Sequence, residues 1–545
     1  MKIKKLFSAG AVAALAMFAI TAQANSIDAD AARAAAKNFV NSKATKTFKG
    51  RAATADIKLA YTEKSDVSGN AYYVFNVEGG GWVIIAGDDH AKQVLAYGDK
   101  GNIDMNDMPS NMKSQLYTYK LQIEQIQNYK GILVAGKAHK NVNVVEPLTK
   151  STWGQNEPMD RFTPTSGSSH YAVGCAPLAM AQIMYYWKYP QESAGMSSYY
   201  VYGGCGTVPA LEATTFDYTQ MLDAYTIFNP ETNGVSLGTY TTEQAEAVAT
   251  LCRYAGHACK ARYGNSGTST GAYSYDQRDA FKFFGYKNDI QLVGFSPSYY
   301  CDNSNKFTED EWKALISVEL EAGRPIAYHN VDYVDGHAWV LDGVDADGKF
   351  HMNWGFYERF NGWFEFGAFG FYPYGDSEYW DFSCSNNTCN EMIIGLYPYD
   401  GYVIPGATTT PMPTIFYQLG DGTITFSAEG NGDVHMYIDG QEVTSPYTMN
   451  LGATEMTVVV SATAQEEGME ISETAENTFL LPVATYIRGD VNNDGNVSIS
   501  DVTALINYLL TNPEAIIIRN DVNLNGKVNI SDVTALINYL LSKQW

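Results

Sequence analysis

Residues 171–190, YAVGCAPLAMAQIMYYWKYP, decide what kind of fold this sequence can form. Gly174 allows a tight turn into a helix, Pro177 fits a first helical turn, and Pro190 ends the run. The stretch therefore predicts a largely apolar helix that begins at Cys175. The exposed N–H groups and the dipole of such a terminus stabilise a thiolate, so Cys175 is a candidate nucleophile. A small cysteine buried like an alanine is the alternative interpretation.

A second stretch, residues 336–355 (GHAWVLDGVDADGKFHMNWG), predicts a β-hairpin with its turn at residues 346–348. The hairpin would bring His337, at the start of its first strand, near Asn353 in its second strand. An imidazole can hold a thiolate as an ion pair and protonate the leaving amine, and Asn353 can accept a hydrogen bond from the ring N–H. The alternatives are His329 or His351 as the base and Asp342 as the orienting group.

An acyl-transfer site also needs hydrogen-bond donors that face the developing oxyanion. The backbone N–H of the nucleophile is one typical donor, and a side-chain amide can be the second. Gln155, in the segment STWGQNEP at residues 151–158, precedes Cys175 by 20 residues (175 − 155) and is a candidate for this role. An ordinary surface glutamine is the alternative.

Three segments together resemble the oxyanion, nucleophile and histidine regions of the streptopain family of cysteine peptidases: TWGQNEP, GCAPLAMAQIMYYWKYP and GHAWVLDGVDADGKFHMNWG. The resemblance covers about residues 25–398, because GWVIIAGDDHAKQVLAYGDKG at residues 81–101 is similar to the propeptide of that family. It implies a papain-like fold, peptide or protein substrates, and a propeptide that masks the site until it is removed. A bulky apolar residue two positions before the scissile bond is the implied preference.

Carried over to this sequence, the resemblance assigns a role to each candidate residue. Cys175 would be the nucleophile, His337 the general base and acid, and Gln155 part of the oxyanion hole. Asn353 would orient His337, and Trp354 would screen that hydrogen bond from water. The glycine-rich WGWGG that follows the family's asparagine is replaced here by WGFYERFNGW, so the loop past Gly355 departs from the pattern.

Length and composition limit the possible functions. A chain of 545 residues is expected to form about three or four domains. Its net charge of −24 argues against nucleic acid and anionic membranes as partners. Residues 1–24 have the basic start, apolar middle and Ala-Gln-Ala end of a signal peptide, which predicts a secreted protein, and no later segment is long enough to span a membrane. Seven cysteines are an odd number, so at least one thiol is expected to stay unpaired.

The chain as a whole predicts an α+β multidomain protein. Residues 25–147 would form an α+β inhibitory propeptide that ends in a polar, cleavable linker, with the cut between about Lys137 and Lys150. The expected order after it is a papain-like peptidase domain at 148–399, a β-sandwich module at 400–485 and a small helical module at 486–545.

The last segment repeats itself with a period of 31 residues (521 − 490), and ten consecutive residues, DVTALINYLL, are identical in both copies. Each copy begins with a loop whose oxygen ligands have the spacing of an EF-hand. The first loop offers Asp490, Asn492, Asp494, Asn496 (its carbonyl), Ser498 and Asp501, and the second offers Asp521, Asn523, Asn525, Lys527 (its carbonyl), Asn529 and Asp532.

Both loops end in Asp where an EF-hand has Glu, and no helix precedes them. With the duplication, these departures resemble a type I dockerin, which implies calcium as the ligand and a cohesin as the partner. Each loop is followed by a predicted helix with one apolar face: Val502, Leu505, Ile506 and Leu509 in the first copy, and Val533, Leu536, Ile537 and Leu540 in the second.

Three functions fit these observations. The first is a secreted cysteine endopeptidase made as a zymogen, with no cofactor for catalysis. The second is another Cys-His acyl-transfer enzyme, such as a transglutaminase or an amidase, because the residues specify the chemistry better than the substrate. The third is a non-catalytic adhesin or scaffold component.

Overall fold

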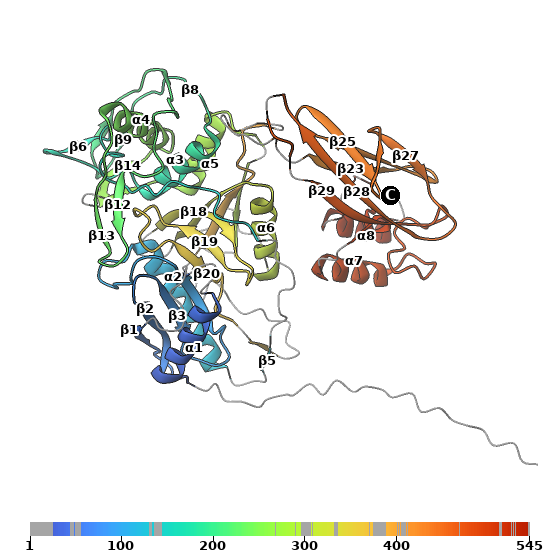
Figure 1. The fold of residues 1–545 in the computed structure, drawn as a ribbon, viewed down its shortest axis with the longest axis horizontal. Coiled ribbons are helices and arrows are strands. Elements are labelled where there is room, and N and C mark those ends of the chain that lie inside the picture. The colour runs from blue at the N-terminus through green and yellow to red at the C-terminus, as the bar shows by residue number, and fades with distance from the viewer. Residues whose placement is uncertain are drawn as a thin grey trace, which may run out of the picture. The chain divides into compact units, whose positions relative to one another are not determined.

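The computed structural model describes the following parts of the chain: residues 26–43, 48, 56–129, 133–135, 144–266, 269–288, 290–295, 307, 309–331, 336–369, 371–373, 389–399, 402, 404, 410, 413–467, 469–472, 474–511, 515–524, 526, 528 and 530–542. The predicted signal peptide, Cys301 and Cys384 lie outside these residues. The chain folds into two compact units, Met1–Tyr399 and Asp400–Trp545 (Figure 1).

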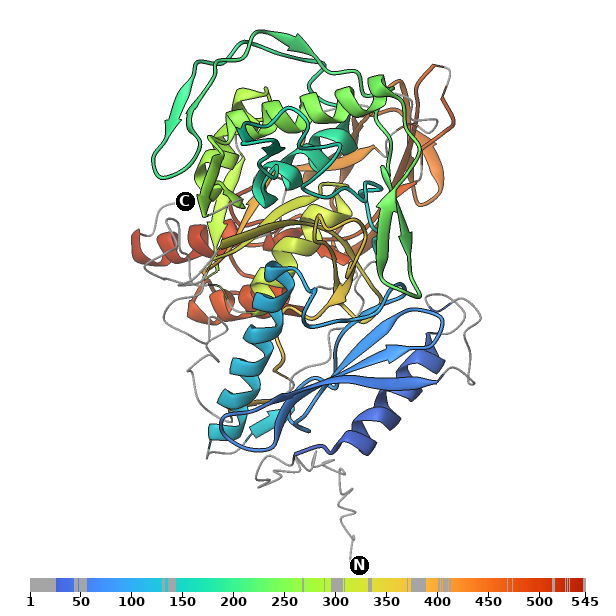
Figure 2. The same cartoon turned by 90° about the vertical axis from the view of Figure 1, so that its left-hand side faces the viewer.

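One antiparallel sheet of ten strands organises the first unit (Figures 1 and 2). Its strands, in spatial order, are β1 (Ile57–Lys64), β2 (Asn70–Val77), β3 (Trp82–Ala86), β4 (Val94–Gly98), β20 (Gly362–Phe364), β19 (Phe350–Asn353), β18 (Gly336–Val344), β17 (Ile326–Val331), β22 (Cys389–Ile394) and β16 (Gln291–Gly294). The first four belong to the predicted propeptide and the last six to the predicted peptidase. They join where Tyr97 of β4 pairs with Trp363 of β20.

Two helices cover opposite faces of the propeptide strands. The first is α1 (Ala29–Ser42), which begins where the Asp28 carboxylate caps the N–H groups of Asp30 and Ala31. It packs on the face formed by Tyr73, Phe75, Val83 and Ile85. The second is α2 (Ser110–Asn128), whose buried residues share a core with Tyr72, Val74, Trp82 and Ile84. Successive residues of β2 and β3 therefore serve the two helices alternately, as the pleat requires.

Four helices accompany the other half of the sheet: α3 (Cys175–Trp187), α4 (Thr242–Ala258), α5 (Ser274–Phe283) and α6 (Glu309–Glu321). The central one is α3, which packs against β17 and β18 and also against α4 and α5. The remaining strands form short pairs: β6 (Thr165–Ser166) with β7 (Ser169–His170), β8 (Glu192–Ser193) with β11 (Thr214–Thr215), β9 (Tyr199–Val201) with β10 (Gly206–Val208), β12 (Thr226–Asn229) with β13 (Gly234–Leu237), β14 (Arg262–Ser266) with β15 (Ser269–Gly271), and β5 (Leu133–Ala135) with β21 (Phe371–Pro373).

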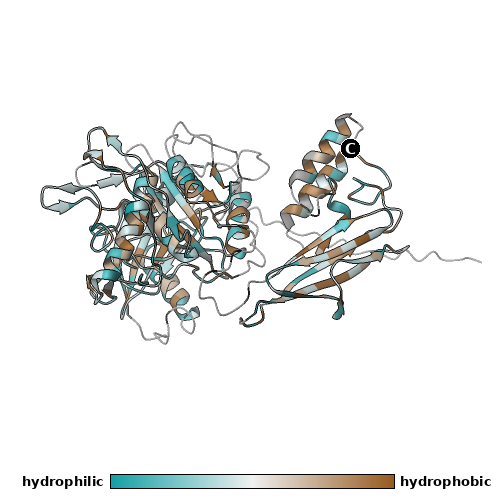
Figure 3. Ribbon diagram, turned by 90° about the horizontal axis from the view of Figure 1, so that it is seen from above, coloured by the Kyte–Doolittle hydropathy of each residue, from teal (hydrophilic) through white to brown (hydrophobic). Residues whose placement is uncertain are grey.

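The second unit contains two sheets and two helices. One sheet holds β23 (Thr414–Leu419), β24 (Thr423–Glu429) and β27 (Tyr447–Asn450), and the other holds β26 (Gln441–Val443), β25 (Asp433–Ile438), β28 (Met456–Gln465), β29 (Ala475–Leu481) and β30 (Ala515–Ile517). Side chains of both sheets share one core, and hydrophobic positions recur along the strands (Figure 3). The helices are α7 (Ile499–Thr511) and α8 (Ile530–Ser542), one from each sequence repeat.

The strand β30 lies between the two sequence repeats, yet it pairs in parallel with β29 of the larger sheet. Ile518, in a 3₁₀ turn at Ile518–Asn520, is fully buried in the core of the two sheets. The repeats and the sheets are therefore one folded unit, a connection that the sequence does not predict.

The predicted linker is only partly exposed. Its residues 136–143 lie outside the described part of the chain, but Val145 exchanges two backbone hydrogen bonds of 2.9 Å with Val344. The Leu148 N–H donates to the carbonyl of Asp342, and the Thr149 N–H donates to the Asp342 carboxylate, each at 2.9 Å. The second half of the linker thus lies along β18 instead of in solvent. Among the described residues, no helix combines the length and the apolar character needed to cross a membrane.

Candidate active site

Cys175 is the first residue of α3, as the sequence predicts. The preceding Gly174 has a φ of +97°, and a Cβ there would lie 2.9 Å from the Thr270 side chain and backbone. Only glycine fits this turn without strain or collision. The body of α3 is buried, whereas Cys175 is a free, partly exposed thiol at its N-terminus. The helix therefore presents one reactive group at the end where a thiolate is stabilised.

Gln155 lies beside the entry to this helix. Its carbonyl accepts a hydrogen bond of 2.9 Å from the Val173 N–H, two residues before Cys175. Gln155 itself is partly exposed, and its neighbours Trp153 and Gly154 are buried. The structure thus brings the predicted oxyanion segment to the predicted nucleophile, although the two are separated in the sequence.

His337 lies at the start of β18, paired with Asn330 of β17, and it is partly exposed. The next residue, Ala338, pairs with His329. The His329 Nε2–H donates to Gln277 Oε1 at 2.6 Å, and Gln277 Nε2 donates to the carbonyl of Ala176, also at 2.6 Å. This chain of contacts ties the β17–β18 pair that carries His337 to the first turn of α3.

The two other candidate histidines have partners of their own. His329 is buried, and burial lowers its pKa to about 4, so it is a poor base at neutral pH. His351 on β19 bonds through Nδ1 to Asp342 at 2.6 Å. Asp342 is fully buried and also accepts hydrogen bonds from Thr149, so it links β18, β19 and the linker. These residues hold the sheet together around the candidate site.

Asn353 is on β19 of the predicted hairpin, but its amide bonds elsewhere. Nδ2 donates to the Ser151 carbonyl at 2.8 Å, and Oδ1 accepts from the Gly355 N–H at 3.2 Å. Within the described residues, none of the Asn353 hydrogen bonds goes to His337. The reason is the pleat. Asn353 lies opposite Val340, and His337 is three positions before Val340 on β18; because this offset is odd, His337 lies on the other face. The orienting role of Asn353 stays a prediction.

Trp354 is part of the hydrophobic core. Its ring lies 4.9 Å from that of Trp339 and 5.1 Å from that of Phe364, between centroids. Its indole Nε1–H donates to the Phe360 carbonyl at 3.0 Å. Trp354 therefore anchors the loop that follows it, and its predicted screening of a His337 hydrogen bond is not tested by these contacts.

In each predicted calcium loop, backbone N–H groups donate hydrogen bonds to the first and last carboxylates. In the first loop, the Gly495 N–H donates to Asp490 at 2.9 Å, and the N–H groups of Val491 and Ser498 donate to Asp501, each at 2.9 Å. The second loop repeats this pattern where Gly526 donates to Asp521 at 2.9 Å and Asn523 donates to Asp532 at 3.0 Å.

All four terminal carboxylates of these loops are buried: Asp490, Asp501, Asp521 and Asp532. Buried carboxylates in a loop of this ligand spacing fit a divalent cation that prefers oxygen ligands, as calcium does. Three of the predicted ligands, Asn525, Lys527 and Asn529, lie outside the described residues.

Comparison with known proteins places these observations in a family. Residues 153–364 match the Peptidase C10 family, residues 24–123 match the Spi protease inhibitor, and residues 488–541 match the dockerin type I domain. The chain contains a C10-family cysteine peptidase domain.

Two named proteins and one solved fragment are similar to parts of this chain. Streptopain of Streptococcus pyogenes is 28% identical over 342 residues, which cover 58% of this chain and 80% of streptopain. The thiol protease/hemagglutinin PrtT of Porphyromonas gingivalis is 25% identical over 431 residues, which cover 75% of this chain and 46% of PrtT. A solved fragment of prointerpain A from Prevotella intermedia is 23% identical, with a TM-score of 0.46, and the match covers 63% of this chain and 99% of the fragment.

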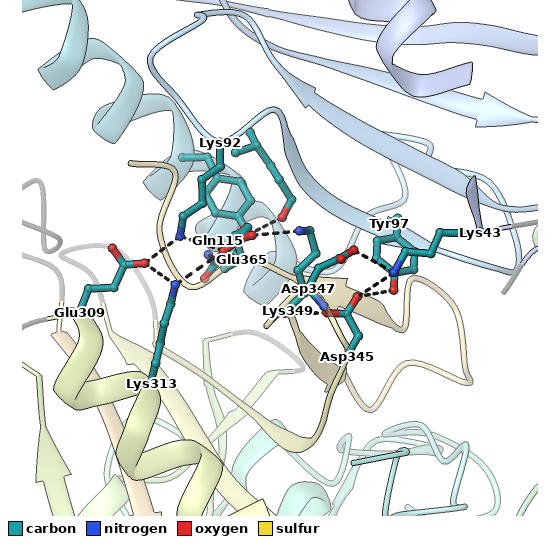
Figure 4. Close-up of polar contacts among 12 residues, drawn as sticks. Lys43, Lys92, Tyr97, Gln115, Glu309, Lys313, Asp345, Asp347, Lys349 and Glu365 are labelled. Carbon is teal, nitrogen blue, oxygen red and sulfur yellow. Dashed lines mark hydrogen bonds and ion pairs between the residues drawn. The ribbon is translucent and has the colours of Figure 1, made fainter. Parts of the chain in front are cut away.

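The C10 peptidase domain and the inhibitor-like region meet in a buried network of charges (Figure 4). Lys92 of the inhibitor-like region lies between Glu309 at 2.8 Å and Glu365 at 2.9 Å of the peptidase. Glu365 also pairs with Lys349 at 2.9 Å. Burial alone would raise the pKa of Glu365, but Lys349, Lys92 and Lys313 outweigh it and hold that pKa well below its usual range. The inhibitor-like region therefore supplies one cation to a cluster whose remaining members belong to the peptidase.

The peptidase uses residues that the sequence does not single out. Gln277 is fully buried and connects α5 to α3, but glutamine is common on helix surfaces, so no pattern identifies it. Tyr357 contacts the oxyanion segment, and its only signal in the sequence is the departure from the glycine-rich WGWGG pattern. Lys92 lies in an ordinary alternating stretch, and its partners are more than 200 residues away along the chain.

Proposed function

We propose that this chain is the precursor of a secreted cysteine endopeptidase, with Cys175 as nucleophile and His337 as general base and acid. The Cys175 thiolate attacks the carbonyl carbon of the scissile peptide bond, and the carbonyl oxygen becomes an oxyanion. The backbone N–H of Cys175 and the side-chain amide of Gln155 stabilise that charge. The observation that carries the proposal is the free thiol at the N-terminus of α3 with the Gln155 segment bonded beside it.

Collapse of the tetrahedral intermediate breaks the C–N bond, and the His337 imidazolium gives its proton to the leaving amine. Water then attacks the thioester with His337 as base, which releases the acid product and restores the thiolate. The family resemblance implies that Asn353 orients His337 in the active enzyme and that Trp354 keeps water away from that contact, an arrangement that the described residues of the precursor do not have. No step needs a metal ion from the calcium loops.

In this proposal residues 1–24 direct secretion, residues 25–147 inhibit the peptidase at 148–399, and cleavage of the linker activates it. The pairing of β4 with β20 and the Lys92 contacts support inhibition by a region that is built into the peptidase sheet. Because residues 145–149 lie along β18, the cut is expected before Val145.

We further propose that residues 400–485 form a β-sandwich module and residues 486–545 a dockerin that binds one calcium ion in each loop. The shared core of the two sheets and the buried loop carboxylates support these roles. The module would tether the peptidase to a cohesin-like partner outside the cell.

The test compares two cysteine variants on casein. Cys175→Ala should abolish cleavage and leave the precursor unprocessed, because no other group can replace the thiolate. Cys205→Ala is the matched control, since Cys205 is also a free and partly exposed thiol, and it should cleave casein normally. Casein cleavage by purified Cys175→Ala protein would contradict the assignment.

A further inference from the structure

The loop that follows Trp354 holds bulky residues in left-handed backbone conformations. Tyr357 has a φ of +60°, Glu358 of +68° and Phe360 of +65°. This region favours glycine, because a residue with a Cβ is strained in it. A loop that keeps three such residues must be held by its contacts, so the side chains at these positions are expected to have specific partners.

Tyr357 has its partners in the oxyanion segment. Its backbone N–H donates to the carbonyl of Trp153 at 3.2 Å, and its hydroxyl accepts from the Asn156 N–H at 3.1 Å. Its ring covers Gly154 so closely that a Cβ on Gly154 would lie 2.2 Å from the ring. Tyr357 therefore contacts the residues on both sides of Gln155.

These contacts complete the support of Gln155. The Val173 N–H holds the Gln155 carbonyl beside α3. Tyr357 bonds to the Trp153 carbonyl before Gln155 and to the Asn156 N–H after it. An oxyanion hole acts through donors fixed in place before the reaction, so small displacements of a donor reduce the rate. The backbone that carries Gln155 is thus held by a side chain outside the catalytic set.

The loop itself is anchored independently of Tyr357. Asn361 Oδ1 accepts from the Trp354 N–H at 3.1 Å, and the Trp354 indole donates to the Phe360 carbonyl. Two residues of the loop, Glu358 and Arg359, form ion pairs with Lys100 and Asp107 of the inhibitor-like region. The Trp354, Phe360 and Asn361 contacts lie within the peptidase, so they persist after the inhibitor-like region is removed. Removal of the Tyr357 hydroxyl alone should leave them in place, which makes a mild substitution informative in the activated enzyme.

We propose that Tyr357 is a positioning residue that holds the Gln155 segment as one wall of the oxyanion hole. The inference rests on the proposed function of Cys175 and Gln155 and adds to it the residue that fixes their relative placement. Tyr357 touches neither the thiol nor the scissile bond in this role. It acts through the backbone of Trp153, Gly154 and Asn156.

The first test is Tyr357→Phe in the activated enzyme, with a peptide amide as substrate. The value of kcat should fall about tenfold, less than the about 10²-fold or greater loss expected for removal of an oxyanion donor, with KM unchanged. Affinity for a peptide aldehyde, whose thiol adduct places an oxyanion in the hole, should fall by the same factor. Alkylation of Cys175 by iodoacetamide, which forms no oxyanion, should keep its rate and its pH profile.

Tyr254→Phe is the matched control, because the Tyr254 hydroxyl also bonds to a backbone group, the Glu212 carbonyl at 2.6 Å, but on α4. It should leave kcat and aldehyde affinity unchanged. An unchanged kcat in Tyr357→Phe would overturn the proposal. A fall in kcat accompanied by an equal fall in the alkylation rate would also overturn it, because it would indicate general damage to the Cys175 site. An activated wild type that is not alkylated at Cys175 would instead refute the proposed function.

A second test uses the contact between the ring and Gly154. Gly154→Ala should impair kcat severely in the wild type, because the new methyl group collides with the Tyr357 ring. In a Tyr357→Gly background, which also relieves the left-handed backbone, the added methyl group should have little further effect. If Gly154→Ala lowers kcat equally in both backgrounds, the Tyr357 ring does not press on the Gly154 segment, and the proposal is overturned.

Discussion

Gln277 is a buried side chain whose amide joins three elements of the peptidase. It lies on α5, donates to the first turn of α3 and accepts from His329 on β17. Because its oxygen accepts from the ring, the imidazole can make this bond while neutral. Burial then favours the neutral ring, which explains why the pKa of His329 falls to about 4.

This environment makes the catalytic half sensitive to acid. The unfolded chain binds a proton on His329 near pH 6.5, but the folded chain resists it until about pH 4. Between these values the unfolded state binds more protons, so the stability from this group is complete above pH 6.5 and falls as the pH drops toward 4. His329→Gln, which keeps a donor for Gln277 and does not titrate, should show a smaller loss of Tm across this range.

The measurement is thermal unfolding against pH in the Cys175→Ala precursor, which cannot digest itself. His435→Gln, on β25 of the second unit, serves as the control for a histidine-to-glutamine change outside the peptidase domain. If His329→Gln and the parent lose stability in parallel, His329 is not the group responsible.

At the scale of elements, the inhibitor-like region extends the sheet of the peptidase. The join is short: Tyr97 and Ala96 of β4 pair with Trp363 and Phe364 of β20. Two backbone hydrogen bonds of 2.8 Å, from Glu365 to Leu95 and from Lys92 to Ala368, continue this join. The side-chain contacts across the join add to these few backbone bonds. The Lys92 pairs with Glu309 and Glu365 cross it close to the strand pair.

Lys92→Met should therefore weaken the attachment of the inhibitor-like region to the peptidase domain. The change keeps the length of the side chain and removes its charge, while Glu309 and Glu365 keep Lys313 and Lys349 as partners. Loss of one partner of a buried interfacial ion pair is expected to speed self-activation about tenfold or more. The measurement is the rate at which purified precursor converts to the mature form.

Lys58→Met provides the comparison, because the Lys58 side chain is 70% exposed and its pair with Asp56 should contribute little. Hydrogen exchange in Cys175→Ala precursors would also show faster exchange of β4 and β20 amides for Lys92→Met only. Equal activation rates for the two variants would mean that the charge network does not hold the region in place.

The sequence predicts the elements that depend on local patterns. Gly174 before an apolar run predicts the start of α3, and the turn at residues 346–348 predicts the β18–β19 hairpin. The predicted apolar faces of α7 and α8 are too wide. They include Ile506 and Ile537, but the side chains of both are more than a third exposed. The two helices bury a narrower stripe around Leu505 and Leu536.

Contacts between distant segments are not predicted from the sequence. The pairing of Tyr97 with Trp363 and the contact of Tyr357 with Asn156 depend on the tertiary fold, and neither leaves a periodic signal. The hydrogen bonds of Asn353 also depend on which face of β19 it occupies relative to His337. Residue types therefore indicate the chemistry, whereas the supporting contacts require the structure.

At the scale of the whole molecule, the second unit links the two predicted calcium loops to the two sheets. The first and last carboxylates of both loops are buried, and β30 between the repeats pairs with β29 of the larger sheet. Without an ion these carboxylates lose a compensating charge, so chelation should unfold the repeats and free β30 from β29. Calcium binding energy would then appear as folding energy of residues 486–545.

The corresponding measurement is calorimetric calcium titration of the full Cys175→Ala chain, combined with hydrogen exchange in chelator. Asp490→Ala with Asp501→Ala should weaken the first site more than Asn523→Ala weakens the second, because two carboxylates are lost instead of one neutral ligand. Peptidase activity of the matching active chains on a soluble substrate should not change. No calcium-linked heat and no change in exchange would refute the calcium assignment without affecting the peptidase.

The central claim is that Cys175 is the nucleophile of a peptidase, and covalent labelling tests it most directly. The activated protein is treated with an epoxide inhibitor of papain-like enzymes, assayed on casein and digested so that the labelled residue can be mapped. The account predicts one label, on Cys175, and loss of casein cleavage in proportion to labelling. A label on another cysteine such as Cys205, or casein cleavage by protein fully labelled at Cys175, would contradict it.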